Sequence, residues 1–276
     1  MLKARKNALP GFGLTLSCTG AYVTLIVLLP IAALLLKTAS LSLDDFLAIV
    51  TAPRALESYR VTLGAAAWAT AINAVLGLLL AWILSRYEFP GRRLLDAAIE
   101  LPFALPTAVA GIALVTLFAR NGWVGQYLDP LGVKIVYTQA GIVAAMTFTS
   151  LPFVVRTVQP VLADLDPELE EAGFLLGGNG RQVFTRVLFP AFFPAFLAGC
   201  SLSFARSLGE FGAVIFIAGN LPMKTEITAL LVFIRLEEFD YPAAAAYATV
   251  LLVISFVLLL VTNAIQSWHL RYMRAE

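Results

Sequence analysis

Long stretches without charge decide the fold of this chain, and the last of them covers residues 241–268, YPAAAAYATVLLVISFVLLLVTNAIQSW. It holds 28 residues with no Asp, Glu, Lys, Arg or His. The hydrocarbon core of a bilayer is about 30 Å thick, and a helix needs roughly 20 apolar residues to cross it. Lipid offers no partner for backbone N–H and C=O groups, so such a segment crosses as a helix, which satisfies them internally. We therefore expect a transmembrane helix here.

Five more apolar runs precede this one. They cover residues 14–36, 61–85, 101–119, 138–155 and 187–205, and the last is expected to continue past Arg206 and Glu210 to Met223. The first run is too long for the apolar core of a signal peptide, so it counts as a span. The sequence predicts an all-α polytopic membrane protein with six transmembrane helices in a single domain, residues 1–276.

Composition excludes the main soluble classes. Of the 276 residues, 60% are hydrophobic and 13% are charged, and the mean hydropathy is +0.85. Soluble domains carry roughly 25% charged residues, so a water-facing surface could not be built from what remains. The net charge of +1 leaves no footprint for a nucleic acid. Cys18 and Cys200 lie in apolar runs at a spacing that fits no metal or redox motif.

The distribution of Lys and Arg predicts the orientation, because cytoplasmic flanks of spans carry an excess of them. With the N-terminus inside, eleven basic residues lie on the inner side and seven on the outer side. Lys3, Arg5 and Lys6, directly before the first span, favour the same direction. Both termini are expected in the cytoplasm.

A polar segment of residues 157–190 separates the fourth and fifth runs. Asp166 is a good N-cap, Pro167 suits the first helical position, and Gly177 is expected to end this short helix. The helix starts with carboxylates that complement its dipole: Glu168, Glu170 and Glu171.

A second short helix over residues 181–189 is expected to complete an elbow, with the fifth span beginning at Pro190. Helices shorter than about 12 residues are marginal in water, so the elbow needs a partner to dock against. The alternative is a solvated, acidic interfacial loop.

The spacing of this segment resembles the EAA loop of ABC importer permeases. Glu171-Ala172-Gly173, three residues, Gly177, nine residues and then Val187-Leu-Phe-Pro190 follow the family pattern Glu-Ala-Ala, three residues, Gly, nine residues, Ile-x-Leu-Pro. Gly173, Val187 and Phe189 depart from it. The resemblance implies the type I importer permease fold, in which this elbow is a coupling helix that docks on a cytoplasmic ATPase. The residues implied in coupling are Glu170, Glu171, Ala172, Gly173, Leu176, Gly177, Val187 and Pro190.

Other stretches are similar to the branch of this family that imports tetrahedral oxyanions. They are residues 101–111 (LPFALPTAVAG), 149–160 (TSLPFVVRTVQP) and 207–214 (SLGEFGAV). Residues 216–220 (FIAGN), 224–228 (KTEIT) and 238–242 (EFDYP) resemble the sulfate/thiosulfate permeases within that branch. The resemblance implies uptake of sulfate or thiosulfate across a bacterial inner membrane, with molybdate or tungstate as the alternative.

Ionisable residues inside a span are costly and mark functional sites by default. Arg206 and Glu210 are four residues apart and are expected to pair on one helix face, either as a structural ion pair or along the translocation path. Pro102 and Pro106 predict a broken third span, for which the alternative is a simple packing kink. The residues proposed for the path are Pro102, Pro106, Thr107, Arg206, Ser207, Gly209, Glu210 and Gly212.

A P-loop needs a glycine directly before its Lys-Ser/Thr pair. The chain has Lys-Thr pairs at residues 37–38 and 224–225, but Leu36 and Met223 precede them, so it has no P-loop. We therefore expect no enzyme activity, no metal and no bound cofactor, with ATP and Mg²⁺ held by partner subunits. The resemblance implies a pair of ATP-binding subunits, a second related permease subunit and a periplasmic or lipid-anchored binding protein, in contact with membrane lipid. A secondary anion carrier driven by an ion gradient is the alternative of a different class.

Overall fold

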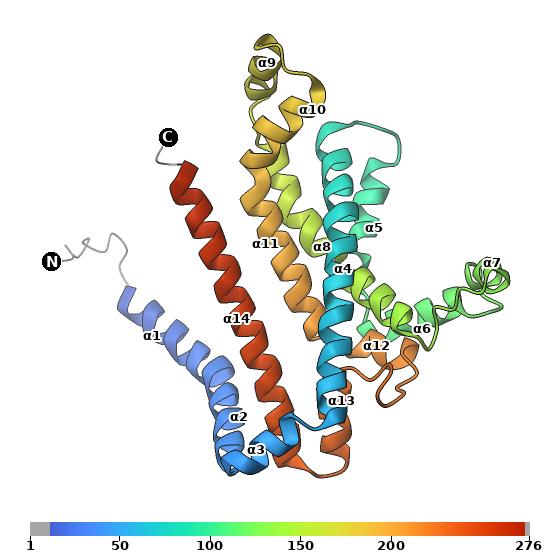
Figure 1. The fold of residues 1–276 in the computed structure, drawn as a ribbon. Helices are drawn as coiled ribbons and strands as arrows, with labels where there is room; N and C mark the ends of the chain where they lie inside the picture. Colours follow the sequence, from blue (N-terminus) through green and yellow to red (C-terminus); the bar gives the residue numbers. More distant parts are fainter. Residues whose placement is uncertain (1–11, 274–276) are drawn as a thin grey trace.

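The structure is a computed structural model that describes residues 12–273, and this part of the chain consists of helices joined by loops (Figure 1). Five helical segments are long and apolar enough to cross a membrane. They are Phe12–Ala39 (α1 Phe12–Val23, η1 Thr24–Leu28, α2 Leu29–Ala39), Pro53–Arg86 (α4), Gln139–Ala163 (α8), Gly180–Leu208 (α10 Gly180–Val183, η3 Phe184–Leu188, α11 Phe189–Leu208) and Tyr241–Met273 (α14). A bent pair, α5 (Arg92–Ala104) and α6 (Thr107–Phe118), makes a sixth span if it is counted as one. The expected all-helical, multi-span fold is confirmed.

Short helices connect these segments. They are α3 (Leu43–Val50), α7 (Gly125–Leu128), η2 (Asp129–Leu131), α9 (Pro167–Leu175), α12 (Gly212–Ile217) and α13 (Thr228–Glu237). Four of the basic residues used to predict the orientation, Lys3, Arg5, Lys6 and Arg274, lie outside the described residues.

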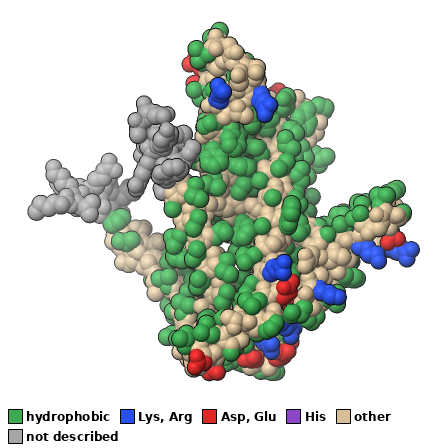
Figure 2. All heavy atoms as spheres, viewed as in Figure 1, with side chains coloured by type: hydrophobic (Ala, Val, Ile, Leu, Met, Phe, Trp, Pro, Cys, Tyr) green, Lys and Arg blue, Asp and Glu red, His purple; other side chains and the backbone are tan. Residues whose placement is uncertain are grey.

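The molecule has two distinct ends. α9 and α10 project at one end, called here the hairpin end, while α3 and α13 lie at the opposite end (Figure 1). The last turns of α14 point toward the hairpin end. Figure 2 shows hydrophobic side chains over the middle of the visible face, whereas charged side chains gather near the two ends and along the segment around α7. This distribution fits a membrane-spanning body.

The third span, expected as a proline-broken run of residues 101–119, is broken in the structure, but its bounds differ. α5 begins earlier, at Arg92, and ends at Ala104, and α6 then leaves with a bend of 116°. Proline has no backbone N–H, and it forces the preceding residue out of the helical region. Leu105, directly before Pro106, accordingly has an extended ψ of 134°. Pro102 stays inside α5, so Pro106 makes the break.

The fifth span also differs at both ends. It begins at Gly180, so residues 181–189 continue directly into the span and do not form a separate helix of the elbow. The helix passes Pro190 through the π-helical stretch η3, where the N–H of Phe189 donates to the C=O of Phe184. A wider turn of this kind relieves the clash between a proline ring and the preceding turn. At its other end the helix stops at Leu208 and does not continue to Met223, because the chain turns at Gly209.

Three spans, α4, α8 and α11, form the centre of the bundle, and one residue of α8 packs against both of the others. Val154 of α8 is fully buried. A Cβ atom added to Gly77 of α4 would lie 2.8 Å from the Cβ of Val154, and one added to Gly199 of α11 would lie 3.0 Å from its Cα. Small residues of this kind let helix backbones approach closely inside membranes. Val154 therefore fills two glycine notches at once.

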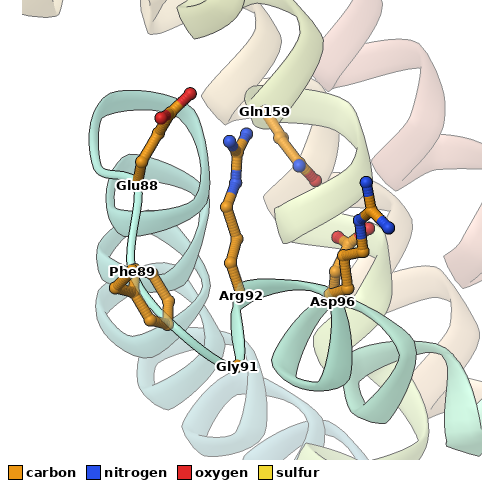
Figure 3. A pocket seen from close by; sticks show the side chains of 7 residues that line it. Glu88, Phe89, Gly91, Arg92, Asp96 and Gln159 are labelled. Atoms are coloured by element: carbon orange, nitrogen blue, oxygen red, sulfur yellow. The ribbon is translucent and has the colours of Figure 1, made fainter.

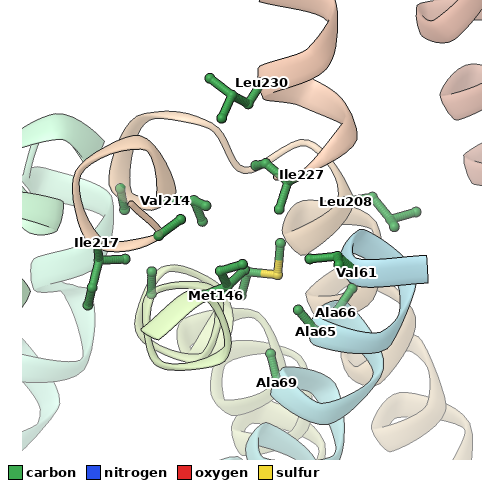
Figure 4. Close-up of a cluster of buried hydrophobic side chains, with 14 residues drawn as sticks. Val61, Ala65, Ala66, Ala69, Met146, Leu208, Val214, Ile217, Ile227 and Leu230 are labelled. Atoms are coloured by element: carbon green, nitrogen blue, oxygen red, sulfur yellow. The ribbon is translucent and has the colours of Figure 1, made fainter. Parts of the chain in front are cut away.

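A hydrophobic cluster fixes the short helices of the opposite end onto this centre. Val61, Ala65 and Met146 of α4 and α8 pack with Val214 of α12 and Ile227, which precedes α13 (Figure 4). All of these side chains are buried. The segment after α11 is thus attached firmly to the spans, although it is not itself a continuous helix.

The glycine notch generates a prediction about stability. We expect Gly77→Ala to lower the free energy of unfolding by about 1–3 kcal/mol, because the new methyl group overlaps Val154. The matched control is Gly64→Ala in the same helix, where no atom lies within 4 Å of the added Cβ. That control should be neutral or stabilising by up to about 1 kcal/mol, since Ala is the better helix former. Thermal unfolding of the detergent-solubilised protein measures both, and an equal gain in the two variants would contradict the packing described here.

Candidate coupling and translocation sites

The hairpin end carries the predicted short helix, and its start follows the sequence signals. α9 begins at Pro167, and the side chain of its N-cap, Asp166, accepts a hydrogen bond from the N–H of Glu168 at 3.0 Å. This bond satisfies one of the free donors of the first turn. The predicted N-cap and first helical position are therefore confirmed.

The turn after α9 is held by two consecutive capping motifs. Gly177 has a φ of +82°, its N–H donates to the C=O of Phe174 at 2.9 Å, and the N–H of Gly178 donates to the C=O of Gly173 at 3.1 Å. This is a Schellman motif, which glycine favours because the left-handed conformation costs it little. Asn179 and Gln182 then exchange two hydrogen bonds of 2.9 Å in a capping box that starts α10. α9 is thereby fixed at a defined angle to the start of the fifth span.

Gly173 brings α9 onto that span. A Cβ atom at this position would lie 3.1 Å from Cγ2 of Val183 and 3.6 Å from Cγ2 of Val187. The departure from the family pattern, Gly in place of Ala, thus permits close packing of α9 against the chain that becomes α11. Gly173 and Val187, both predicted coupling residues, lie together in this contact.

The outward surface of the hairpin is apolar and acidic. Leu175 and Leu176 are 88% and 90% exposed, and Phe174 is 48% exposed. Glu171 and Ala172 are exposed beside them. Exposed apolar side chains gathered on a projecting element are typical of a surface that binds another protein. A shallow groove of about 330 Å³ lies behind them, lined by Gly173, Leu176, Gly177, Gly178, Gln182, Val183, Arg186 and Val187.

Two of the predicted coupling residues are placed differently. Glu170 turns toward the bundle, where its Oε2 lies 3.4 Å from Nη1 of Arg86 at the end of α4. Pro190 lies within the fifth span, next to its π-helical stretch, and not in the hairpin. The exposed surface of the hairpin therefore consists of α9 residues and the turn that follows.

The predicted ion pair in the fifth span forms, although its two residues do not share a helix. α11 ends at Leu208, so Glu210 lies in the turn beyond it. Nη1 of Arg206 lies 2.7 Å from Oε2 of Glu210, an ion pair whose geometry does not make a hydrogen bond. Oε1 of Glu210 accepts a hydrogen bond of 2.9 Å from the N–H of Ala213. The Glu210 side chain is only 1% exposed, whereas that of Arg206 is 32% exposed. A buried carboxylate thus has two partners, and the guanidinium remains partly accessible.

The two breaks in the spans meet at this point. A Cβ atom at Gly212, the first residue of α12, would lie 2.1 Å from Oγ1 of Thr107, the first residue of α6. A Cβ atom at Gly111 would lie 2.5 Å from the C=O oxygen of Ala213. The structure thus brings Thr107, Gly212 and Glu210 close together. Gly209 and Pro106 flank the two breaks, and Pro102 lies buried in α5.

Ser207, also predicted for the path, lies inside the bundle in a polar cluster that sequence reasoning missed. Asn73 of α4 donates to Ser150 of α8 at 2.8 Å and to Ser203 of α11 at 3.2 Å, and Ser207 donates to Ser150 at 3.1 Å. All four side chains are buried. Polar side chains link transmembrane helices in this way. The signal was present, because Asn73 is the only asparagine in the run 61–85.

A second buried ion pair lies at the end opposite the hairpin. Arg54 donates from Nε and Nη2 to the two carboxylate oxygens of Glu226 at 2.8 and 2.7 Å. The N–H of Thr228 donates to Thr62 at 2.8 Å. Residues 224–228, which carried the sulfate-permease resemblance, therefore anchor the segment after α12 to α4. The sequence pattern alone indicated no partner for Glu226.

A cavity of about 500 Å³ at the hairpin end is lined by charges of both signs. In Figure 3 the side chain of Arg92 extends between those of Glu88 and Gln159, and Asp96 lies on the side of Arg92 away from Glu88. Asp96 is paired with Arg156 of α8 at 2.8 Å. The cavity lies between α5 and α8. Among the side chains that the structure describes, no group of three or more His, Cys, Asp or Glu is arranged to hold a metal ion.

Comparisons with known proteins agree with this architecture. Residues 73–275 match the family described as binding-protein-dependent transport system inner membrane component. The chain is 55% identical to the sulfate transport system permease protein CysT of Salmonella typhimurium and 54% identical to that of Escherichia coli, in each case over 95% of both chains. It is 50% identical to the CysT protein of Synechocystis, covering 91% of this chain and 88% of that protein.

Solved structures share the fold at low sequence identity. A bacterial ABC transporter that imports the polysaccharide alginate has a TM-score of 0.75 at 16% identity, over 92% of this chain and 94% of that chain. The inward-facing MetNI methionine ABC transporter has a TM-score of 0.60 at 15% identity, over 83% and 99%. The type I importer permease fold expected from the EAA-like segment is confirmed. With its membrane-spanning helices and these full-length relatives, the chain is a multi-pass inner-membrane permease subunit of an ABC transporter and belongs to the binding-protein-dependent transport system inner membrane component family.

Proposed function

We propose that this permease carries sulfate, and thiosulfate as a close analogue, into the cell by ATP-driven alternating access. The observation that carries the proposal is the rigidly capped hairpin, which offers an exposed apolar and acidic surface at one end of the spans. The relatives named for sulfate transport, at 55% identity over 95% of the chain, support the choice of substrate. Molybdate, tungstate and gradient-driven transport are the outcomes that the experiment below separates.

The transporter needs partners that supply energy and deliver substrate. Two ATP-binding subunits hold ATP and Mg²⁺ and receive α9, and this chain holds no nucleotide. A second related permease subunit completes the membrane pair, and a periplasmic or lipid-anchored protein delivers the anion at the end opposite the hairpin. The hairpin end then faces the cytoplasm together with both termini, which agrees with the direction of α14 in Figure 1. The whole chain, residues 1–276, is one permease domain, with residues 157–190 as its coupling segment.

Movement of α9 reaches the path through packed helices. α9 contacts the start of the fifth span at Gly173 and Val183, and that span packs against α4 and α8 around Val154. Packed elements of this kind shift as units between two arrangements. The far end of the fifth span carries Arg206 and leads to the two breaks, so a shift of α11 changes the exposure of that guanidinium.

Arg206 suits weak, transient binding of a dianion. Its guanidinium can form two parallel hydrogen bonds to an oxyanion, while Glu210 repels the same ion. Glu210 is held by the N–H of Ala213 as well as by Arg206. It therefore keeps one partner when an anion occupies Arg206. Such a balance permits release, which a tight site would prevent.

The substrate and energy source can be tested together. In proteoliposomes that contain the complete transporter and its binding protein, we expect radiolabelled sulfate to accumulate only with ATP and Mg²⁺, and thiosulfate to compete. Molybdate should compete poorly. Accumulation driven by a proton or sodium gradient without ATP would contradict the proposal, and preferential accumulation of molybdate would replace its substrate.

The hairpin surface predicts an effect on assembly. Glu171→Lys reverses an exposed charge of the docking surface, so we expect the ATP-binding subunits to be lost from the purified complex and uptake to fall at least tenfold, a loss of about 1.4 kcal/mol or more. Asp164→Lys is the matched control, because Asp164 is exposed at the same end but lies before α9. Co-purification measures both variants. If the Glu171→Lys variant retained the ATP-binding subunits, α9 would not be part of the docking surface.

The ion pair predicts different results for stability and transport. Arg206→Gln leaves Glu210 buried without its counter-charge, which costs about 3–5 kcal/mol. The double variant Arg206→Gln/Glu210→Gln removes both charges and keeps an oxygen for Ala213, so we expect its thermal stability to recover while sulfate uptake stays at least tenfold low.

The control for this experiment is the pair Arg235 and Glu238, 2.7 Å apart, whose carboxylate is 48% exposed and whose double Gln variant should transport normally. Thermal unfolding and uptake are measured on the same preparations. Recovery of both stability and uptake in the Arg206/Glu210 double variant would show that the pair is structural only.

A further inference from the structure

Arg86, the last residue of α4, connects α4 to α9 at the hairpin end. Its Nη1 lies 3.4 Å from Oε2 of Glu170 in α9, and its guanidinium carbon lies 5.3 Å from the ring centre of Trp82, one turn earlier in α4. The side chains of Arg86 and Glu170 are 21% and 34% exposed. A partly buried ion pair is screened less by salt than one on an open surface. A cation over an indole ring is also favourable.

Trp82 passes this contact on to the fifth span. Its ring meets the ring of Phe184 edge to face, with centroids 5.5 Å apart and planes at 73°. The ring centroid of Phe184, in the π-helical stretch η3, lies 6.2 Å from the ring centroids of both Phe189 and Phe192. Aromatic pairs of this geometry add stability beyond their buried area. A continuous set of contacts thus runs from Glu170 through Arg86 and Trp82 to α11.

Arg86 has little else to hold it in place. Among the described residues, its buried Nε and Nη2 atoms have no hydrogen-bond partner, and Glu170 provides its only ion pair. If α9 moved without α4, this cation would lose its counter-charge in a partly buried site. Loss of a partner from such a pair is unfavourable. Movement of α9 and of α4 is therefore linked through this side chain.

We propose that Arg86 is a positioning residue for coupling, which ties α4 to the hairpin so that both α4 and α11 follow the movement of α9. The proposal rests on the function proposed above, because it assumes that ATP-binding subunits move α9. α11 is joined to α9 directly by the chain, whereas α4 precedes α9 by about 80 residues and contacts it through the Arg86–Glu170 ion pair. Without that link, ATP hydrolysis continues while the spans move incompletely.

The test is the ratio of sulfate taken up to ATP hydrolysed, measured on the same proteoliposomes of the complete transporter. We expect Arg86→Gln and Glu170→Gln each to keep the ATP-binding subunits and their hydrolysis, and to lower this ratio about fivefold, which corresponds to about 1 kcal/mol. The double variant should be no worse than either single variant, because both remove the same contact. Arg86→Lys keeps the charge and should restore part of the ratio.

Arg93→Gln is the matched control, since Arg93 lies at the same end, is exposed and forms no ion pair among the described residues. It should keep the normal ratio. An unchanged ratio in Arg86→Gln and Glu170→Gln, or additive losses in the double variant, would overturn the link. If Arg86→Gln fails to fold, Glu170→Gln still tests the link, because it changes the more exposed partner of the same ion pair. Absence of ATP-dependent uptake in the unmodified transporter would instead overturn the proposed function.

Discussion

A helix that stops within a membrane-spanning region leaves backbone N–H and C=O groups that lipid cannot satisfy, and in the described part of the chain α5 and α11 stop in this way. α5 ends at Ala104, before Pro106, and α11 ends at Leu208, before Gly209. The structure brings the two breaks against each other. Gly212 and Gly111 allow α12 and α6 to approach within backbone contact, and the side chain of Glu210 accepts an N–H at the start of α12. The breaks persist because protein atoms cover them where the broken helices meet.

The same constraint governs charge. The buried carboxylates Glu210 and Glu226 each have an arginine partner, at 2.7 Å in both cases. Removing one charge from such a pair is far costlier than removing both. Arg206 is nevertheless one-third exposed, and Glu210 has a second partner in the backbone. The pair is stable enough to exist inside the bundle, and its guanidinium stays available to an anion.

Coupling over the length of the molecule depends on contacts of two kinds. Between α9 and α11 the chain is continuous, and the Schellman motif, the capping box and the packing at Gly173 fix the angle between them. Between α9 and α4 the connection consists of side chains, Glu170 and Arg86. Deeper in the bundle, Val154 and the Asn73 cluster join α4, α8 and α11. A push on the hairpin can therefore move three spans together.

The sequence by itself determined the class of fold, the approximate spans and the start and end of α9. These follow from local properties: uninterrupted apolar length, the N-cap at Asp166 and the left-handed glycine at Gly177. It also indicated that Arg206 and Glu210 would pair and that a proline would break the third span. Only the tertiary structure decided that α11 stops at Leu208, that Ser207 joins a buried cluster with Asn73, that Glu226 pairs with Arg54 and that Glu170 faces Arg86. Those partners are between 60 and 180 residues apart or lie across a helix break, and a linear pattern carries no information on which distant side chains packing brings within a few ångströms.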